Sequence, residues 1–342
     1  MAALQTFFAG RKVTIDDIAR EASVSPATVS RVLNGKANVS SSTQKKVLDA
    51  AKKLHYLSLP GEKANTRPLV GVALPDLESP ESLELVQALN IALSHAGMGM
   101  LLEAQLGNAT NDARCIHHFL DYAVAGAIFV GCSHADTQAD HTDYQKLSQA
   151  GISLSLIDGY ASDITASCFS MDMKNAFEMA ISHLIMLGHA RIGLAMGPQR
   201  FIEMQRAEEA FLAAMKMKKA SNTAHVAVSL SSVEGGYAAC RELIHQHCTA
   251  VVCTSPAMAL GAYQAAQNNG MPIPEKLSII SLGDFPEAPF LSPSLTVVRK
   301  PVIPMCEAAV NALSTSLSSG RQASKELLFR SSLIVRGSTG SH

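Results

Sequence analysis

The stretch that decides the fold is residues 13–57, VTIDDIAREASVSPATVSRVLNGKANVSSSTQKKVLDAAKKLHYL. Thr14 is a suitable N-cap for a helix over 15–22, and Ser25 with Pro26 is a typical start for a second helix that ends at Asn34-Gly35. A third amphipathic helix is expected over about 42–54. The side chains expected to face inward are Ile15, Ile18, Ala19, Ala22, Val29, Val32, Leu33, Val47, Leu48, Ala51 and Leu54. This spacing predicts a helix-turn-helix with a supporting helix.

The second helix carries residue types that read DNA. Its N-terminus would bring Pro26 and Ala27 to the bases first, because a major groove is wide enough to admit an α-helix. Arg31, one turn further, has a guanidinium fork that matches O6 and N7 of guanine. Donors for phosphate or base contacts are Thr28, Ser30 and Asn34. The alternative is a three-helix bundle whose basic face is merely solvated.

Three motifs carry a family resemblance: TIDDIA (14–19), SPATVSRVLNG (25–35) and VSSSTQKKVLDAAKKLHY (39–56). Together they resemble, without a gap, the DNA-binding head of the lactose-repressor type (LacI/GalR) of bacterial transcription regulators. The resemblance implies a dimer that binds a pseudo-palindromic operator of double-stranded DNA. The positions that the family uses against DNA are here Thr14, Ile15, Ser25, Pro26, Ala27, Thr28, Ser30, Arg31, Asn34, Asn38, Ser40, Thr43 and Tyr56.

The net charge of −1 conceals an asymmetry along the 342 residues. Residues 1–67 hold 11 basic and 5 acidic side chains, a formal charge of +6, whereas the remainder carries −7. The basic residues are therefore concentrated where phosphate contacts are expected, and the acidic remainder should not adhere to DNA.

Other features exclude several classes of protein. The seven cysteines are scattered singly, which indicates buried thiols rather than disulfides or a zinc site. No catalytic or phosphate-binding motif is present, so we expect no enzyme, no cofactor and no metal. Residues 1–12 are interpreted as a flexible extension, not as a signal peptide, and no apolar run is long enough to span a membrane. A cytoplasmic protein is expected.

Residues 58–68, SLPGEKANTRP, are interpreted as a hinge between the head and the body. In the family, this stretch forms a short helix on DNA, and one leucine enters the minor groove. Here Asn65 stands at that position, and Pro60-Gly61 disfavours a helix before Glu62. We expect a hinge that orders on DNA but wedges poorly between bases, because an asparagine is not an apolar wedge.

From residue 69 onward, apolar strands alternate with amphipathic helices, which predicts parallel sheets covered on both faces. The expected strands are 69–76, 98–105, 126–131, 152–158, 168–172, 191–197, 225–230, 250–255, 277–283, 295–301 and 327–338. The expected helices are 81–96, 110–122, 143–150, 175–187, 203–217, 234–246, 257–269 and 302–318. Two doubly wound α/β lobes account for this number of elements.

The body also resembles the family's effector-binding region, in residues 183–197, in residues 258–284 and in the ending LIVRGS. The resemblance implies a periplasmic-binding-protein-like (type I) body over 69–338, in which the chain crosses between the lobes three times. Turn residues place the crossings near 160–162, 286–292 and 319–322. The N-lobe is then 69–160 plus 290–318, and the C-lobe is 163–285 plus 325–338.

A small-molecule effector would lie between the lobes, at the carboxyl ends of the strands. The candidate contacts are Asp76, Ser79, Ser133, Asp158, Arg206, Ser255 and Asp284. For each of them, solvation or local helix capping is an open alternative. Two hypotheses remain for the whole chain: a dimeric repressor modulated by a sugar or other metabolite, or a DNA-binding regulator controlled by a protein partner or by its abundance. An enzyme or an exported binding protein is a third, less favoured reading.

Overall fold

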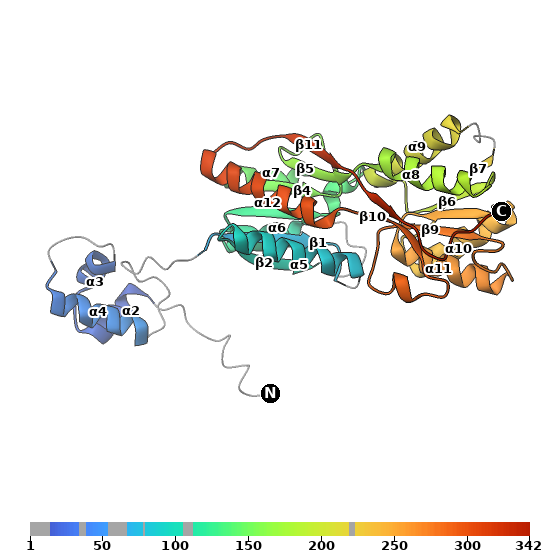
Figure 1. The fold of residues 1–342 in the computed structure, drawn as a ribbon. Helices are drawn as coiled ribbons and strands as arrows, with labels where there is room; N and C mark the ends of the chain where they lie inside the picture. The colour runs from blue at the N-terminus through green and yellow to red at the C-terminus, as the bar shows by residue number, and fades with distance from the viewer. Residues whose placement is uncertain (1–13, 34–38, 54–66, 78, 105–111, 219–222) are drawn as a thin grey trace. The chain divides into compact units, whose positions relative to one another are not determined.

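The computed structural model describes residues 14–33, 39–53, 67–77, 79–104, 112–218 and 223–342 (Figure 1). The chain divides into a head, residues 1–66, and a body, residues 67–342. Several sequence predictions lie outside the described residues: the extension 1–12, Asn34, Asn38, Leu54, Tyr56 and most of the hinge, including Asn65.

The head consists of α2 (Ile15–Ala22), α3 (Pro26–Leu33) and α4 (Ser41–Lys53). Each helix starts at a polar cap, because the first backbone N–H groups of a helix have no partner within it. Thr14 and Asp17 form a reciprocal capping box on α2, Ser25 caps α3 through the Thr28 N–H, and Ser40 caps α4 through the Thr43 N–H.

The core of the head follows the helical spacing of its apolar residues. Its buried members are Ile18, Ala19, Ala22, Val29, Val32, Leu33, Val47, Ala50 and Ala51. The prediction that Ile15 also faces inward is wrong, because its side chain remains 38% exposed. The buried stripe of α2 begins one turn later, at Ile18.

The body contains two six-stranded sheets, which confirms the predicted pair of α/β lobes (Figure 1). The N-lobe sheet has the order β11-β5-β4-β3-β1-β2 and is entirely parallel. Its strands are β1 (Leu69–Leu74), β2 (Gly99–Ala104), β3 (Gly126–Val130), β4 (Ser153–Ile157), β5 (Ser167–Met171) and β11 (Lys325–Phe329). Its helices are α5 (Pro80–His95), α6 (Ala113–Asp121), α7 (Thr142–Gln149) and α12 (Val302–Ser319). Helices α5 and α12 cover one face of the sheet, while α6 and α7 pack on the other.

The C-lobe sheet has the order β12-β10-β9-β8-β6-β7, with only the β10–β12 pair antiparallel. Its strands are β6 (Ile192–Met196), β7 (Ala224–Val228), β8 (Ala250–Cys253), β9 (Ser278–Leu282), β10 (Thr296–Arg299) and β12 (Ser332–Ile334). Helices α8 (Met173–Met186) and α9 (Ile202–Met217) cover one face, and α10 (Val233–His245) and α11 (Pro256–Asn268) cover the other. Every central strand is buried on both faces, as a continuous apolar run predicts.

The predicted lobe boundaries are wrong at all three crossings. Strand β5 belongs to the N-lobe rather than the C-lobe, and β10 belongs to the C-lobe rather than the N-lobe. The single strand expected over 327–338 is two strands, β11 in the N-lobe and β12 in the C-lobe. The crossings therefore lie near 172, 300–301 and 330–331 instead of 160–162, 286–292 and 319–322.

These boundaries could not be placed from turn residues because each crossing is only one or two residues long. Turn-forming residues mark loops within a lobe, such as the segment after β4, whereas a crossing continues almost directly from a strand. The first and third crossings also contact each other, since the Asp172 N–H donates to the Phe329 carbonyl and the Ser331 N–H donates to Asn175 Oδ1. These neighbours in space carry no shared sequence signal.

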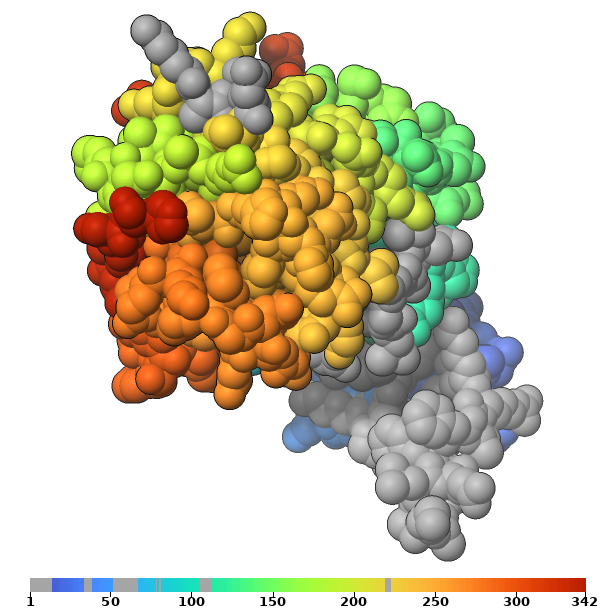
Figure 2. Space-filling model, turned by 90° about the vertical axis from the view of Figure 1, so that its right-hand side faces the viewer, coloured from blue at the N-terminus to red at the C-terminus, as the bar shows by residue number. Residues whose placement is uncertain are grey.

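The C-terminal residues are bound to the surface of the C-lobe (Figure 2). The His342 N–H donates to the Leu187 carbonyl, and its ring stacks on that of His189 with centroids 5.4 Å apart. His189 is itself buried and hydrogen-bonded to Thr249 and Ser278. All seven cysteines are buried and free, as predicted.

Helices α10 and α11 approach so closely that glycines are required at their contact. A Cβ atom on Gly261 would lie 2.0 Å from the Val233 carbonyl oxygen, and one on Gly236 would lie 2.2 Å from that of Met258. We expect Gly261→Ala to lower the free energy of unfolding of the body by about 1–3 kcal/mol, because neither backbone can yield. Urea unfolding followed by circular dichroism measures this.

The matched control is Gly99→Ala on β2, where the added Cβ would meet only Leu69 Cδ1, at an ordinary 3.5 Å. If both variants unfold at the same urea concentration, the close approach of the two helices is not what requires glycine.

Candidate DNA interface and interlobe cleft

The N-terminus of α3 presents the residues predicted to meet DNA. Pro26, Ala27 and Arg31 are exposed, whereas Thr28 and Ser30 are half-buried. Ser25 Oγ lies 3.2 Å from the Thr28 backbone nitrogen and 2.8 Å from Thr28 Oγ1. The cap thus fixes the first turn of α3 and leaves Arg31 projecting from it.

The remaining described positions surround helix ends. Thr14 and Ser40 are exposed caps, Thr43 bonds to the Ser40 hydroxyl at 2.8 Å, and Ile15 is exposed. Lys45 and Lys46 are exposed on α4. The described residues of the head therefore offer an exposed helix N-terminus flanked by hydroxyls and cations, which is a surface suited to a phosphate backbone.

The second site is a charged cluster where the lobes meet. Lys300 lies on the crossing from β10 to α12, and its Nζ donates to Glu81 Oε1 at 2.6 Å and to Asp158 Oδ2. Glu81 is on α5 and Asp158 follows β4, so both of these carboxylates belong to the N-lobe. The side chains of Lys300 and Asp158 are only 10% and 8% exposed. This ion pair is therefore largely removed from water.

A third carboxyl group, that of Glu203 on α9, reaches the cluster from the C-lobe, since it lines the same cavity as Asp158 and Lys300. Burial and the neighbouring Asp158 charge raise the pKa of Glu203 to about 8. Burial likewise raises the pKa of Asp158, although Lys300 opposes that effect. For Lys300, burial opposes protonation, but Asp158 and Glu81 raise its pKa. The raised pKa of Glu203 favours its protonated form, for which Asp158 is the neighbouring acceptor.

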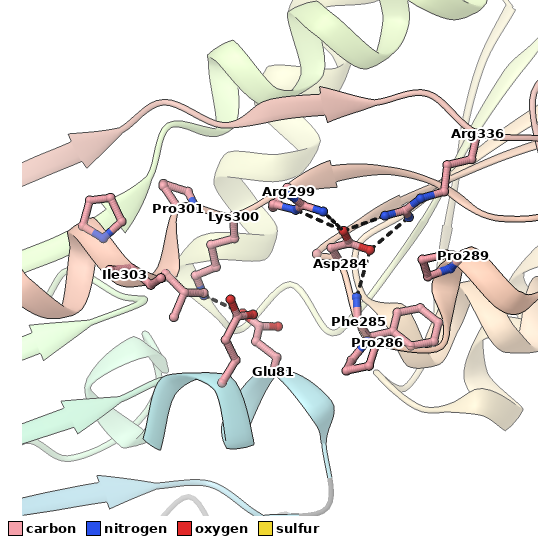
Figure 3. A pocket seen from close by; sticks show the side chains of 14 residues that line it. Glu81, Asp284, Phe285, Pro286, Pro289, Arg299, Lys300, Pro301, Ile303 and Arg336 are labelled. Carbon is pink, nitrogen blue, oxygen red and sulfur yellow. Dashed lines mark hydrogen bonds and ion pairs between the residues drawn. The ribbon is translucent and has the colours of Figure 1, made fainter. Parts of the chain in front are cut away.

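Two adjoining cavities surround this cluster. The smaller, about 70 Å³, is lined by Glu81, Asp158, Met171, Met173, Glu203, Met204, Thr254, Leu282, Gly283 and Lys300. The larger, about 480 Å³, shares Glu81, Gly283 and Lys300 with it and extends along the first turn of α12 (Figure 3). Both cavities are bordered by both lobes.

In the larger cavity, two guanidinium groups converge on one carboxylate (Figure 3). Arg299 Nε lies 3.0 Å from Asp284 Oδ2, and Arg336 approaches with Nη1 3.0 Å from Oδ1 and Nη2 2.8 Å from Oδ2. Burial alone would raise the pKa of Asp284, but these hydrogen bonds to Arg336 and Arg299 lower it. Asp284 is therefore held ionised at the wall of the cavity.

Two further contacts join the lobes. Arg206 on α9 forms a bidentate ion pair with Glu326 on β11, and Arg200 of the C-lobe pairs with the buried Asp136 of the N-lobe. The Thr137 N–H also donates to the Arg200 carbonyl, at 2.9 Å. The lobes are thus connected by two ion pairs as well as by the chain crossings.

The seven predicted effector contacts differ in their position relative to the two cavities. Asp158 and Asp284 line the cavities, and Arg206 bridges the lobes beside them. Ser133 is buried and lines neither cavity, and its hydroxyl donates to Asp112 at 2.5 Å. Asp76, Ser79 and Ser255 make local bonds at helix starts, which is the alternative that the sequence left open.

Sequence reasoning missed Glu81, Glu203, Lys300, Arg299 and Arg336. Lys300 had one available signal, a Lys-Pro pair between a strand and a long helix, but the crossing was expected ten residues earlier. Glu203 lies within an ordinary amphipathic helix, and its role depends on contacts with residues distant in the chain.

A helix-turn-helix head joined to a periplasmic-binding-protein-like body defines a known class of DNA-binding transcription regulator. Residues 14–58 match the model of bacterial regulatory proteins of the lacI family, and residues 181–339 match that of the periplasmic binding protein-like domain. The chain is 40% identical to the HTH-type transcriptional regulator MalR of Streptomyces coelicolor, covering 95% of this chain and 96% of that protein. It is 30% identical to GalS of Salmonella typhimurium, covering 87% and 88%. The chain belongs to the lacI family and is an HTH-type transcriptional regulator.

Solved structures share the fold. A complex of the transcriptional regulator CelR with cellobiose has a TM-score of 0.70 at 23% identity, covering 95% of this chain and 99% of that one. The lac repressor dimer bound to operator and the anti-inducer ONPF has a TM-score of 0.71 at 22% identity, covering 97% and 100%. Within the described residues, no helix is long and apolar enough to cross a membrane, and no cluster of three metal-ligating side chains occurs.

The raised pKa of Glu203 predicts a pH dependence of stability. Between about 4.5 and 8, the folded protein keeps a proton on Glu203 that the unfolded chain loses, so stability falls as pH rises. Glu203→Gln retains a donor to Asp158 but does not titrate. We expect the stability of the wild type relative to this variant to decrease through that window by at most about 1.4 kcal/mol per pH unit.

Urea unfolding of both proteins at several pH values, followed by circular dichroism, measures the difference. Parallel stability curves would contradict a proton held between Glu203 and Asp158.

Proposed function

We propose that the chain is a repressor that binds a pseudo-palindromic operator as a homodimer and changes its DNA affinity when a small molecule occupies the interlobe cleft. The observation that carries this proposal is the position of Lys300, on a crossing between the lobes and in contact with carboxylates in the cleft. An occupant that competes for these carboxylates changes the forces between the lobes, and it thereby favours one arrangement of the body over another.

The comparisons support the two halves of this proposal. A structural relative is described as a dimer bound to operator, and another as a complex with cellobiose. We assign the DNA contacts to the positions named from the family resemblance, with Arg31 as the base-reading side chain. Such a regulator acts in the cytoplasm, where the DNA is, and acts by binding rather than by catalysis.

A selection of bound duplexes from a random pool tests the proposal. The full chain should enrich a pseudo-palindromic sequence, and its affinity for that sequence should change when a metabolite extract is added. Enrichment without any response to the extract would contradict the effector half of the proposal, and no enrichment would contradict both halves.

The second candidate function is a regulator that responds to a protein partner or to its own abundance. The small cavity favours this candidate, because about 70 Å³ lies well below the size of ordinary ligand pockets, and Lys300 already occupies the carboxylates. Titration of the chain with a metabolite library, followed calorimetrically, distinguishes the two candidates.

Replacement of Arg31 should relax sequence preference. We expect Arg31→Ala to lose about 1–3 kcal/mol of operator affinity and to accept other bases at one position of each half-site, because only the guanidinium fork matches guanine. Fluorescence anisotropy with single-base operator variants measures this. An equal loss on every duplex would show that Arg31 contacts phosphate instead.

Replacement of Lys45 should change the salt dependence of DNA affinity and leave the sequence preference unchanged. If its ammonium neutralises one phosphate, Lys45→Ala removes about one unit from the slope of log affinity against log salt, because fewer counterions are released. The control is Lys174→Ala, an exposed lysine on α8 of the body, which should leave the slope unchanged. An unaltered slope for Lys45→Ala removes this residue from the interface.

A further inference from the structure

We propose that the interlobe cleft takes a cationic ligand, a protonated primary amine, whose ammonium group lies between Asp158 and Glu203. The inference rests on the proposed function of the cleft as an effector site and names the chemical class of its ligand.

The first argument is the excess of acceptors in the small cavity. Its charged side chains are three carboxyl groups, Glu81, Asp158 and Glu203, against one ammonium group, that of Lys300. Lys300 already donates to two of these carboxyls. Among the residues that line this cavity, no side chain is an amide, and the one hydroxyl, that of Thr254, already donates to Met258 Sδ, so the groups open to a ligand are mainly acceptors. The cavity is therefore suited to a ligand that only donates.

The second argument is the state of Asp158. Its Oδ1 atom is buried and has no hydrogen-bond partner, although Oδ2 accepts from the Lys300 ammonium group. The backbone of Asp158 is in the left-handed region, at φ 56°, which is uncommon for a residue other than glycine and is tolerated where the surroundings hold the residue in place. A buried carboxylate oxygen requires a donor, and here the proton of Glu203 is the available one.

An ammonium group would replace that shared proton. The protonated Glu203 carboxyl loses its proton to solvent as the cation enters, and the resulting carboxylate pairs with the ammonium beside Asp158. The balance is one cation bound and one proton released, with no bond made or broken apart from the O–H bond of Glu203. A neutral hydroxyl ligand would displace no proton, because it does not compensate a second negative charge.

Charged groups from several elements surround the cluster that contains Glu203. They are Glu81 and Glu84 on α5, Asp158 after β4, Arg206 on α9, Asp284 after β9, and Arg299 and Lys300 at the second crossing. Arg206 pairs with Glu326, and Arg299 pairs with Asp284. Neither cation therefore pairs with Asp158 Oδ1.

The size and walls of the cavity agree with an amine. A volume of about 70 Å³ accommodates an ammonium head with a short alkyl segment, but not a sugar ring without movement of the lobes. Met171, Met173 and Met204 form its apolar wall, and thioether side chains adapt to alkyl chains of different shape. The larger adjoining cavity would receive the rest of a longer ligand.

Calorimetric titration of the full chain tests the proposal with two matched ligand pairs: putrescine against butanediol, and glucosamine against glucose. We expect at least one amine to bind at least tenfold more tightly than its neutral counterpart. Titrations at pH 7 in buffers of different ionisation enthalpy should show release of up to one proton for each amine bound.

Variants locate the site. Glu203→Gln and Asp158→Asn should each reduce amine affinity at least tenfold, and Glu203→Gln should abolish proton release. Glu209→Gln, exposed on the same helix, should change neither. Circular dichroism of each variant identifies any failure to fold, and Glu203→Gln keeps the proposal testable if Asp158→Asn unfolds.

Equal or tighter binding of the neutral compounds would overturn the amine class while leaving the cleft as an effector site. Absence of binding by both amines at millimolar concentration would also overturn it. The proposed function fails separately, if operator affinity responds to no component of a metabolite extract.

Discussion

The ion pair between Lys300 and the carboxylates of Glu81 and Asp158 is the interaction on which the body depends. A lysine buried to this degree costs several kcal/mol of desolvation, and close opposite charges must offset that cost. Because Lys300 lies on a segment that connects the lobes, its position links the chain crossing to residues at the ends of α5 and β4. Loss of either partner would leave an uncompensated charge in the cleft.

The cleft is therefore lined by paired charged groups and is not a preformed apolar pocket. Two N-lobe carboxylates hold one ammonium, and burial beside them raises the pKa of a C-lobe carboxyl, that of Glu203. Additional charges at Arg206–Glu326 and Arg200–Asp136 join the lobes at other points. Such an arrangement is sensitive to any donor that enters it, and this gives a physical basis for a body that responds to small molecules.

The head and the two sheets could be predicted from the sequence, since local patterns determine local structure. The caps Thr14, Ser25 and Ser40 and the apolar spacing between Ile18 and Ala51 define the head. The alternation of apolar runs with amphipathic helices predicted both sheets. The prediction that Ile15 faces inward was wrong because periodicity does not show where a packed core ends.

The lobe boundaries and most of the cleft could not be predicted in this way. A crossing of two residues, Lys300-Pro301, looks like the end of a strand, so the chain itself does not reveal which sheet comes next. Ser79 and Ser255 were candidates because they end strand–loop segments, yet their hydroxyls cap helices. Glu81 acquires its role only by contact with Lys300, 219 positions further along the chain, and Glu203 acquires its role only by its place beside residues of the other lobe.

The central claim is that the charge balance at Lys300 governs the DNA affinity of a separate head. The most direct measurement compares operator affinity, by fluorescence anisotropy without ligand, for the wild type, Lys300→Met and Glu81→Gln, with random duplex as the reference for an intact head. The account predicts that both variants change operator affinity several-fold while random-duplex affinity stays constant. Unchanged operator affinity in two folded variants would contradict it.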